Sequence, residues 1–403
     1  MISALPLAAS ILTSGLSVAT SGLVAMAVSW SIISSGADVT WAGVASFAIQ
    51  LPVAAGLALG GLLSDRLGPR RVLLGSDALM FLAVAAAALA ASGALGAAWV
   101  VALLSLGNFL GASGNVAQDS RVPEMARLAG LPLERANGLR DVAFNVGTAA
   151  GPALGVALVA AGGLPLALWG VSAALGVVLL LDAAFFPRFA ARRRAGEEAK
   201  VIAGFAGFTA DRVLLSVVVL GIGLIAVFAS LDEIVAPSLA VAGGLRDSQL
   251  TLFLALNGAA ALVSGLAYTA MGHRLRPHPV LVGGVSSAAA GFLALAALPP
   301  AAAFVAAPLL IGLGVGPLSP LVMTTLQRRV PAAHRGAVLG AFMASILFVQ
   351  PFAALGAAPL VSAVGVGWVT WGLALLAAGA VIAAVTLPAL RELDQTVPKA
   401  APR

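Results

Sequence analysis

Long apolar runs recur along the whole sequence and constrain its fold more than any other feature. Each run holds about 20 or more residues, the length that an α-helix needs to cross the hydrocarbon core of a bilayer. The runs are continuous rather than alternating, which excludes the strands of a membrane β-barrel. Charged side chains make up only 9% of the chain, against roughly 25% in soluble domains. The sequence therefore predicts an all-α membrane protein rather than a soluble helical bundle.

The spacing of the runs predicts twelve transmembrane helices. Their expected positions are 5–33, 41–63, 71–92, 97–118, 138–161, 165–187, 212–240, 249–271, 279–298, 301–325, 336–363 and 367–390.

Basic side chains fall almost entirely on one side of these helices. If the N-terminus is cytoplasmic, 21 of the 22 lysines and arginines lie in cytoplasmic connections, at nearby helix ends or in the C-terminal tail, and Arg246 is the exception. This asymmetry follows the positive-inside rule and predicts that both termini are cytoplasmic. Because topology accounts for the net charge of +6, we expect no nucleic-acid partner.

A charged stretch divides the predicted helices into two groups of six. We expect an N-terminal half at 1–187, a cytoplasmic linker at 188–211, a C-terminal half at 212–390 and a cytoplasmic tail at 391–403. Landmarks recur in both halves: Gly61 and Gly68 match Gly265 and Gly272, and the triplet RVP starts at both Arg121 and Arg329. This order favours two pseudo-symmetric halves with a solute site between them.

The segment GLLSDRLGPRRVL, which follows the second predicted helix, resembles motif A of the major facilitator superfamily. The matching positions include Gly61, Asp65, Arg66, Gly68 and Arg70. The resemblance implies the twelve-helix fold of that superfamily and a cytoplasmic gate at this turn. The alternative is that these charges are solvated and only enforce topology.

The same resemblance implies partners for two gate residues. Asp65 is expected to meet the start of the eleventh helix, where a helix N-terminus favours an anion. Arg70 is expected to reach an acid at the end of the fourth helix, and Asp119 is placed for that role.

The segment GTAAGPALG resembles motif C, which is typical of antiporters and exporters in the superfamily. Gly147, Gly151, Pro152 and Gly155 match the motif. Small residues four apart let two helices pack backbone to backbone, so generic helix packing is the alternative explanation. The stretch from RVPEM to GPALG, which ends in this motif, resembles the sequences of the macrolide and enterobactin exporters, one branch of the superfamily. This resemblance implies a bacterial inner-membrane protein.

Carboxylates inside the apolar runs are candidates for carrying protons, because a buried charge needs a reason to be there. Asp232 and Glu233 in the seventh helix are the first candidates, unless they only lie at the outer interface, and Asp141 beside Arg140 is the next. Asp77 and Asp182 are expected near the cytoplasmic interface, either snorkelling or paired with arginines.

Neutral polar side chains at mid-depth are candidates for lining a solute cavity or for hydrogen-bonding between helices. They are Asn108, Asn115, Asn145, Asn257 and Gln350. Asn108 stands where drug/proton antiporters of the superfamily carry a motif B arginine, so coupling through such an arginine is not expected. The shortage of charge favours an amphipathic or weakly charged solute.

No nucleotide-binding loop, metal-ligand pattern or catalytic motif stands in the sequence, and cysteine is absent. We therefore expect a non-enzymatic secondary transporter without cofactor or metal, working as a monomer and exporting a small solute in exchange for protons or another ion. Uptake of a nutrient such as a sugar or organic anion is the alternative. A non-transporting membrane sensor is the alternative from another class.

Overall fold

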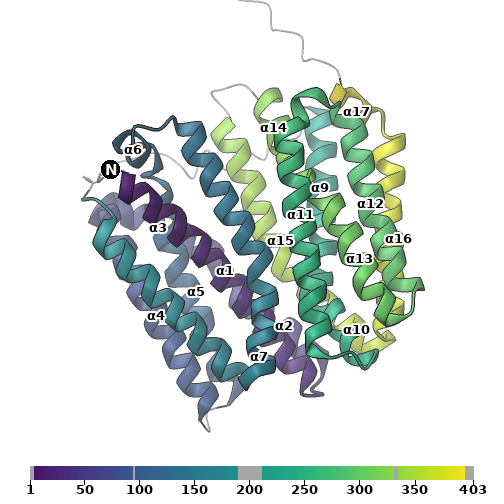
Figure 1. The fold of residues 1–403 in the computed structure, drawn as a ribbon, viewed down its shortest axis with the longest axis horizontal. Coiled ribbons are helices and arrows are strands. Elements are labelled where there is room, and N and C mark those ends of the chain that lie inside the picture. The colour runs from purple at the N-terminus through teal and green to yellow at the C-terminus, as the bar shows by residue number, and fades with distance from the viewer. Residues whose placement is uncertain (1–3, 94–95, 189–210, 331–334, 395–403) are drawn as a thin grey trace, which may run out of the picture. The chain divides into compact units, whose positions relative to one another are not determined.

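The computed structural model describes residues 4–93, 96–188, 211–330 and 335–394, and the regular structure in these ranges is helical (Figure 1). Eleven of the helices are long and apolar enough to cross a membrane. Their termini follow the expected apolar runs closely, since each run ends at glycine, proline or charged residues that break a helix or avoid hydrocarbon.

One of the eleven is too long for a single crossing. It spans Arg135–Phe185, 51 residues, which would extend for about 77 Å as one straight helix, more than twice the hydrocarbon thickness. Its backbone is non-helical at Gly162 and Gly163, and Gly163 has a φ of 73°, which favours glycine. The helix therefore provides two crossings, giving the twelve that the sequence predicts.

The helices of the N-terminal part are α1 (Leu5–Ser34), α2 (Val39–Gln50), α3 (Pro52–Leu67), α4 (Pro69–Ser92), α5 (Ala97–Asp119), α6 (Val122–Leu128) and α7 (Leu133–Phe185). Those of the C-terminal part are α9 (Arg212–Ser230), η2 (Leu231–Val235), α10 (Ala236–Ala242), α11 (Asp247–Met271), η3 (Gly272–Arg274), α12 (Pro277–Ala297), α13 (Pro300–Val315), α14 (Leu318–Arg329), α15 (Arg335–Val364), α16 (Val366–Thr386), α17 (Pro388–Arg391) and η4 (Glu392–Asp394).

The chain forms two compact units that do not coincide with two continuous halves. Unit 1 consists of Met1–Arg194, Asp232–Ala255 and Ala354–Ser362, and unit 2 of the remaining segments. Unit 1 thus combines the N-terminal helices with α10, the start of α11 and the last part of α15. The expected linker lies outside the described residues, except for its two ends, so its role as a domain boundary stays a prediction.

Each unit has its own apolar core. In unit 1, α1 packs along α7, α4 packs on α5 and α7, and buried residues such as Leu104 and Leu168 lie between them. In unit 2, α12 packs on α13 and α16, around buried residues such as Val285 and Phe342. Small residues are frequent in both cores, as expected where helices associate without a hydrophobic driving force.

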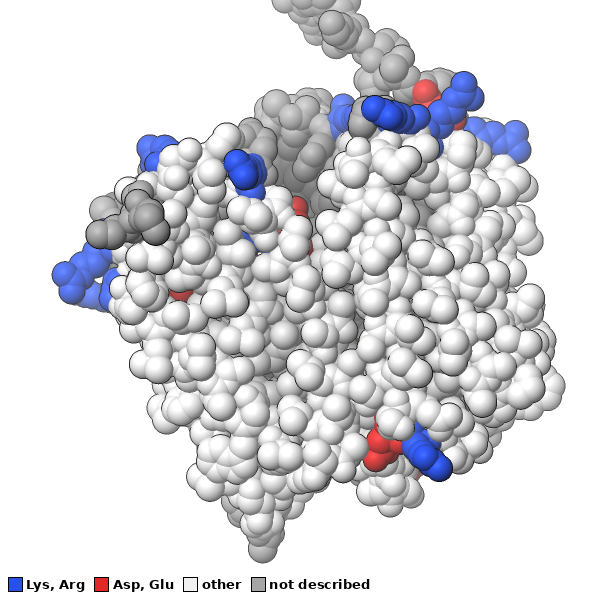
Figure 2. All heavy atoms as spheres, viewed as in Figure 1, with Lys and Arg blue, Asp and Glu red and all other residues white. Residues whose placement is uncertain are grey.

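Charged side chains lie at the helix ends and leave a broad uncharged band on the face drawn in Figure 2. Basic residues gather near α6 in unit 1 and near α17 in unit 2, and we call this the basic end of each unit. Arg246 lies in the turn between α10 and α11. The band and its basic border match the pattern of a membrane-spanning protein.

Candidate functional site

Glu233 lies in an irregular turn of a membrane-spanning helix. The segment Leu231–Val235 is a π-helical turn, η2, between α9 and α10. Pro237 explains the turn, because a proline cannot donate to the carbonyl four residues earlier and its ring clashes with that carbonyl, here that of Glu233. Such π-turns are frequent at functional sites because they redirect side chains. Pro237 therefore sets the direction in which the two adjacent carboxylates of η2 point.

Gln50 of α2 holds the Glu233 carboxylate. Its Nε2 atom donates to both Glu233 carboxylate oxygens, at 2.9 Å each. Gln50 is the last residue of α2, directly before the kink at which Pro52 opens α3. The Ser46 hydroxyl, one turn earlier on α2, also lies close to this carboxylate. The Glu233 site thus joins a helix of the N-terminal part to one of the C-terminal part, within unit 1.

Glu233 lies well inside a helical segment that is long and apolar enough to cross a membrane. It lies nine residues before Ala242, the end of α10, which is about 14 Å along a helix. The flanking residues Leu231 and Ile234 are fully buried. The place of Glu233 relative to the membrane interface stays a prediction.

Asp232 takes a different environment from its neighbour. Its Oδ1 atom is buried and has no hydrogen-bond partner among the described residues. Adjacent helical positions point about 100° apart, so the two carboxylates do not share partners. Only Glu233 is held by a defined donor.

The start of α2 and the end of α15 are also packed together within unit 1. A Cβ on Gly43 would lie 2.5 Å from the Ala358 Cβ atom, so the two backbones approach as closely as glycine allows. Ser362 donates to Asp38 Oδ1 at 2.5 Å, and the Thr40 backbone amide donates to the same oxygen at 2.9 Å. These hydrogen bonds lower the pKa of the exposed Asp38 carboxyl from its usual value.

The residues of the motif A segment form other contacts than expected. Arg70 donates to the backbone carbonyls of Ala183 and Phe186 at the end of α7. Asp119 forms its ion pair with Arg140 of α7. The expected pair between Arg70 and Asp119 is therefore absent from this structure, because each group has a nearer partner on α7.

The remaining motif A residues mark the turn between α3 and α4. Gly68 has a φ of 85° and ends α3, so glycine is required there, and Arg66 is exposed in the last turn of α3. Gly61 also lies in α3. The side chain of Asp65 and the first residues of α15 lie outside the described parts, so their expected contact is untested.

The glycines of GTAAGPALG form a close seam between α7 and α1. A Cβ on Gly147 or Gly151 would lie 2.4 Å from a backbone oxygen of α1, and one on Gly155 would lie 2.8 Å from another. Pro152 packs on Gly22 of α1. The packing that these small residues predict is present, and α1 is the neighbour.

The other candidate polar residues differ in their surroundings. Asn108 donates to the Ile49 carbonyl of α2 at 3.2 Å, which is a contact between helices. Asn145 donates to the Asp141 carbonyl one turn earlier, and both of these side chains are exposed. Asn115 is exposed, and Asn257 and Gln350 are partly exposed. The last three therefore remain available to a solute.

A model of the family "Major Facilitator Superfamily" matches residues 10–354 of the chain. The chain belongs to this superfamily. It is therefore a transporter-family protein and not an enzyme, and the superfamily fold explains the twelve crossings described above.

Relatives within the superfamily match nearly the whole chain. The multidrug efflux pump Tap of Mycobacterium tuberculosis is 27% identical over 389 residues, which covers 94% of this chain and 92% of the pump. The multidrug efflux pump Tap of Mycolicibacterium fortuitum is 26% identical and covers 93% of this chain and 94% of the pump.

Solved structures of the superfamily share the fold. The nucleoside transporter NupG has a TM-score of 0.75 at 12% identity, covering 96% of this chain and 99% of that chain. The D-xylose-proton symporter has a TM-score of 0.71 at 16% identity, covering 97% and 98% respectively. At such identities these structures support the fold alone.

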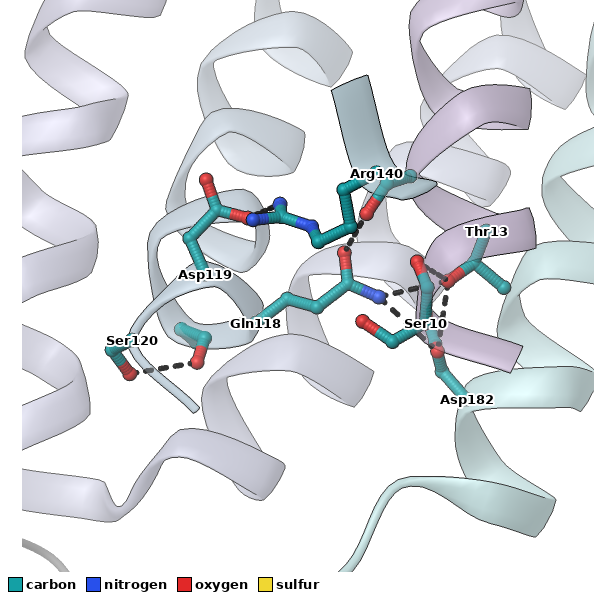
Figure 3. A network of polar contacts seen from close by, with 9 residues as sticks. Ser10, Thr13, Gln118, Asp119, Ser120, Arg140 and Asp182 are labelled. Atoms are coloured by element: carbon teal, nitrogen blue, oxygen red, sulfur yellow. Dashed lines mark hydrogen bonds and ion pairs between the residues drawn. The ribbon is translucent and has the colours of Figure 1, made fainter. Parts of the chain in front are cut away.

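Two glutamines were not among the residues that the sequence singles out. Gln50 holds Glu233, and Gln118 of α5 takes part in a buried network with Thr13 and Asp182 (Figure 3). Asp182 is 2% exposed and accepts hydrogen bonds from Thr13 and Gln118, whereas snorkelling or a pair with an arginine was expected for this residue. The one feature of the sequence that marks Gln50 and Gln118 is a polar amide side chain within an apolar helix.

Proposed function

We propose that this protein exports a small amphipathic solute, such as a drug, in exchange for protons by alternating access. The observation that carries the proposal is its similarity to multidrug efflux pumps over nearly the full length of both chains. The exposed or partly exposed amides of Asn115, Asn257 and Gln350 support a weakly charged solute, since they offer hydrogen bonds but no fixed charge.

Glu233 is the proposed proton carrier. An ionised carboxylate only accepts hydrogen bonds, and the Gln50 amide donates to both of its oxygens. A proton on either oxygen turns that oxygen into a donor and removes the charge, which weakens the contact with Gln50. Outward opening separates α2 from η2, and the Glu233 carboxylate, freed from Gln50, can then take up a proton from the outside.

Closing of the outer ends brings Gln50 and Glu233 into contact again. The neutral, protonated Glu233 can return into the closed outer end without burying a charge, and when it loses its proton to the cytoplasm the carboxylate again accepts from Gln50. The solute crosses in the opposite sense to the proton because both use the same change of conformation. Asp232 and Asp141 are secondary candidates, since neither has a donor that holds its carboxylate in this way.

The same proposal includes the orientation of the protein in the membrane and the direction of transport. The basic ends of both units would face the cytoplasm of a bacterium, with both termini inside and the protein in the inner membrane as a monomer. The motif C seam between α1 and α7 favours export, and the place of this chain near macrolide and enterobactin exporters stays a prediction. Nutrient uptake is the alternative direction.

Transport in oriented membranes tests the proposal. Efflux-deficient cells that express the protein should accumulate less of an exported dye or drug, and an uncoupler should abolish the difference. In inside-out vesicles an acidic interior should drive uptake of the same compound. Glu233→Gln should remove this proton-driven uptake, whereas Asp247→Asn, an acid outside the proposed site, should not. If cells that express the protein instead accumulate more of the compound, and an uncoupler abolishes this accumulation, the result would support the uptake alternative.

A further inference from the structure

A second group of buried polar side chains lies near the basic end of unit 1. Thr13 of α1 donates to Asp182 Oδ1 at 3.2 Å, and Gln118 of α5 donates to Thr13 Oγ1 at 2.8 Å (Figure 3). Ser14 donates to the Gln118 carbonyl oxygen at 3.0 Å. Three helices therefore meet around the Asp182 carboxyl group, which is 2% exposed.

A second carboxyl group approaches the first from α4. Asp77 lies close enough to Asp182 for the two groups to interact directly. Room for Asp77 comes from Gly114 of α5, where an added Cβ would lie 3.5 Å from Asp77 Oδ1. Two carboxylates that interact directly at a site shielded from solvent repel each other unless one of them is protonated.

Two further atoms of the site lack partners. Asp77 Oδ2 is buried without a hydrogen-bond partner among the described residues, and so is the Ser10 hydroxyl oxygen. Ser10 is 1% exposed and lies beside Thr13 and Asp182 in Figure 3. A proton shared by the two carboxyl groups would supply a hydrogen bond that Asp77 otherwise lacks.

The surrounding helices supply no cation to neutralise the pair. The described part of α1 carries no ionisable side chain. Arg140 of α7 pairs with Asp119, and Arg70 of α4 donates to two backbone carbonyls. The other charged side chains on the adjoining elements either are exposed, as Arg71 and Arg135 are, or form the Arg121–Glu124 pair of α6.

We propose that Asp77 and Asp182 bind one shared proton, and that this proton stays bound while transport proceeds. The first statement follows from a buried and a partly buried carboxyl group that meet without a cation among the described residues. The second rests on the proposed function: the pair and its donors come only from α1, α4, α5 and α7, which belong to one predicted half of the transporter, so rocking of the halves would not separate them.

The proton has a structural role in this account. It converts a repulsive pair of carboxylates into a hydrogen-bonded pair that connects α4 to α7, while Thr13 and Gln118 connect the same group to α1 and α5. The site is thus a proton-binding site distinct from Glu233, which joins segments of both predicted halves.

Infrared spectroscopy of the full-length protein in lipid nanodiscs tests the proposal without any transport. With ¹³C-labelled aspartate, the wild-type protein should show an isotope-shifted carboxylic-acid C=O band at neutral pH. The double variant Asp77→Asn/Asp182→Asn should lose this band. Asp211→Asn is the matched control, because Asp211 pairs with Arg329 and lies outside the site.

Each result bears on a separate statement. The absence of a protonated aspartate band from the wild-type protein overturns the proton site, whether or not the variants fold and whether or not the protein transports. A band of undiminished intensity in the double variant also overturns it. A band that is lost when an exported compound or a pH gradient is added shows that the proton is exchanged, and contradicts its permanent binding.

Discussion

Two glutamines in unit 1 each hold a carboxyl group, but they join different parts of the chain. Gln50 connects α2 to η2, which are 183 residues apart in sequence, whereas Gln118 connects α5 to the end of α7, 64 residues away. The first contact crosses from one predicted half to the other, and the second remains inside one half. A contact that must break during rocking can report or drive the movement, and one that need not break can only stabilise the moving body.

The contact between the halves should show the largest effect when it is removed. Gln50→Met keeps the length of the side chain but removes two hydrogen bonds to a charged group, which contribute about 1.5–3 kcal/mol each. Opening of the outer end should rise at least about tenfold, since 1.4 kcal/mol corresponds to a factor of ten. The chain has no cysteine, so Ser46→Cys gives a single buried probe whose labelling by an impermeant maleimide measures this opening.

Gln118→Met in the same Ser46→Cys background is the control for that experiment. It should leave the labelling rate unchanged, because the Asp182 site lies within one half. Equal acceleration by both variants would remove the distinction between the two glutamines.

The seam that supports the Asp182 site should show the next effect. Gly151→Ala places a Cβ atom 2.4 Å from the Ala19 backbone oxygen of α1, and such overpacking costs about 1–3 kcal/mol. Thermal unfolding in detergent should therefore occur at a lower temperature. Gly138→Ala in the same helix meets no atom within 4 Å and should be neutral or slightly stabilising. Equal unfolding temperatures for the two variants would show that α1 and α7 are not closely packed.

Removal of the contact inside one half should lower stability rather than transport. Gln118→Met leaves Thr13, Ser14 and Asp182 each without one partner, at about 0.5–1.5 kcal/mol for each lost hydrogen bond. The temperature of thermal unfolding should therefore fall, whereas the transport rate of the protein that remains folded should change little. A loss of transport at unchanged stability would instead give Gln118 a role in coupling.

The smallest effect is expected at the exposed outer contact between Asp38 and Ser362. The hydrogen bonds from Ser362 and Thr40 lower the pKa of Asp38. The contact therefore contributes its full stability at a pH above the usual aspartate pKa, and this stability is lost as the pH falls through the lowered pKa. Spin labels at Ser35→Cys and Leu360→Cys should separate in a fraction of molecules below about pH 4. Adding Ser362→Ala should remove this pH dependence, and a separation that persists unchanged would assign it to another group.

The sequence predicts the helices well and the pairing between them poorly. The break at Gly162 and Gly163 was expected, because two glycines followed by Pro165 end an apolar run. The partner of Asp119 was not, because the resemblance pointed to Arg70 and the fold brings Arg140 closer. Gln50 is one polar residue in an apolar run, and nothing local indicates that it meets a carboxylate 183 residues away. Which faces of two helices meet depends on packing across the whole bundle, and one sequence alone does not encode it in a readable pattern.

Exchange in proteoliposomes that contain Glu233→Gln tests the central claim most directly. The wild-type protein should accumulate an exported compound against its concentration gradient when an opposing proton gradient is imposed. Glu233→Gln should still exchange labelled for unlabelled compound, because its amide is neutral like the protonated acid, but should no longer accumulate it in response to protons. Proton-driven accumulation at the wild-type level by this variant would contradict the account.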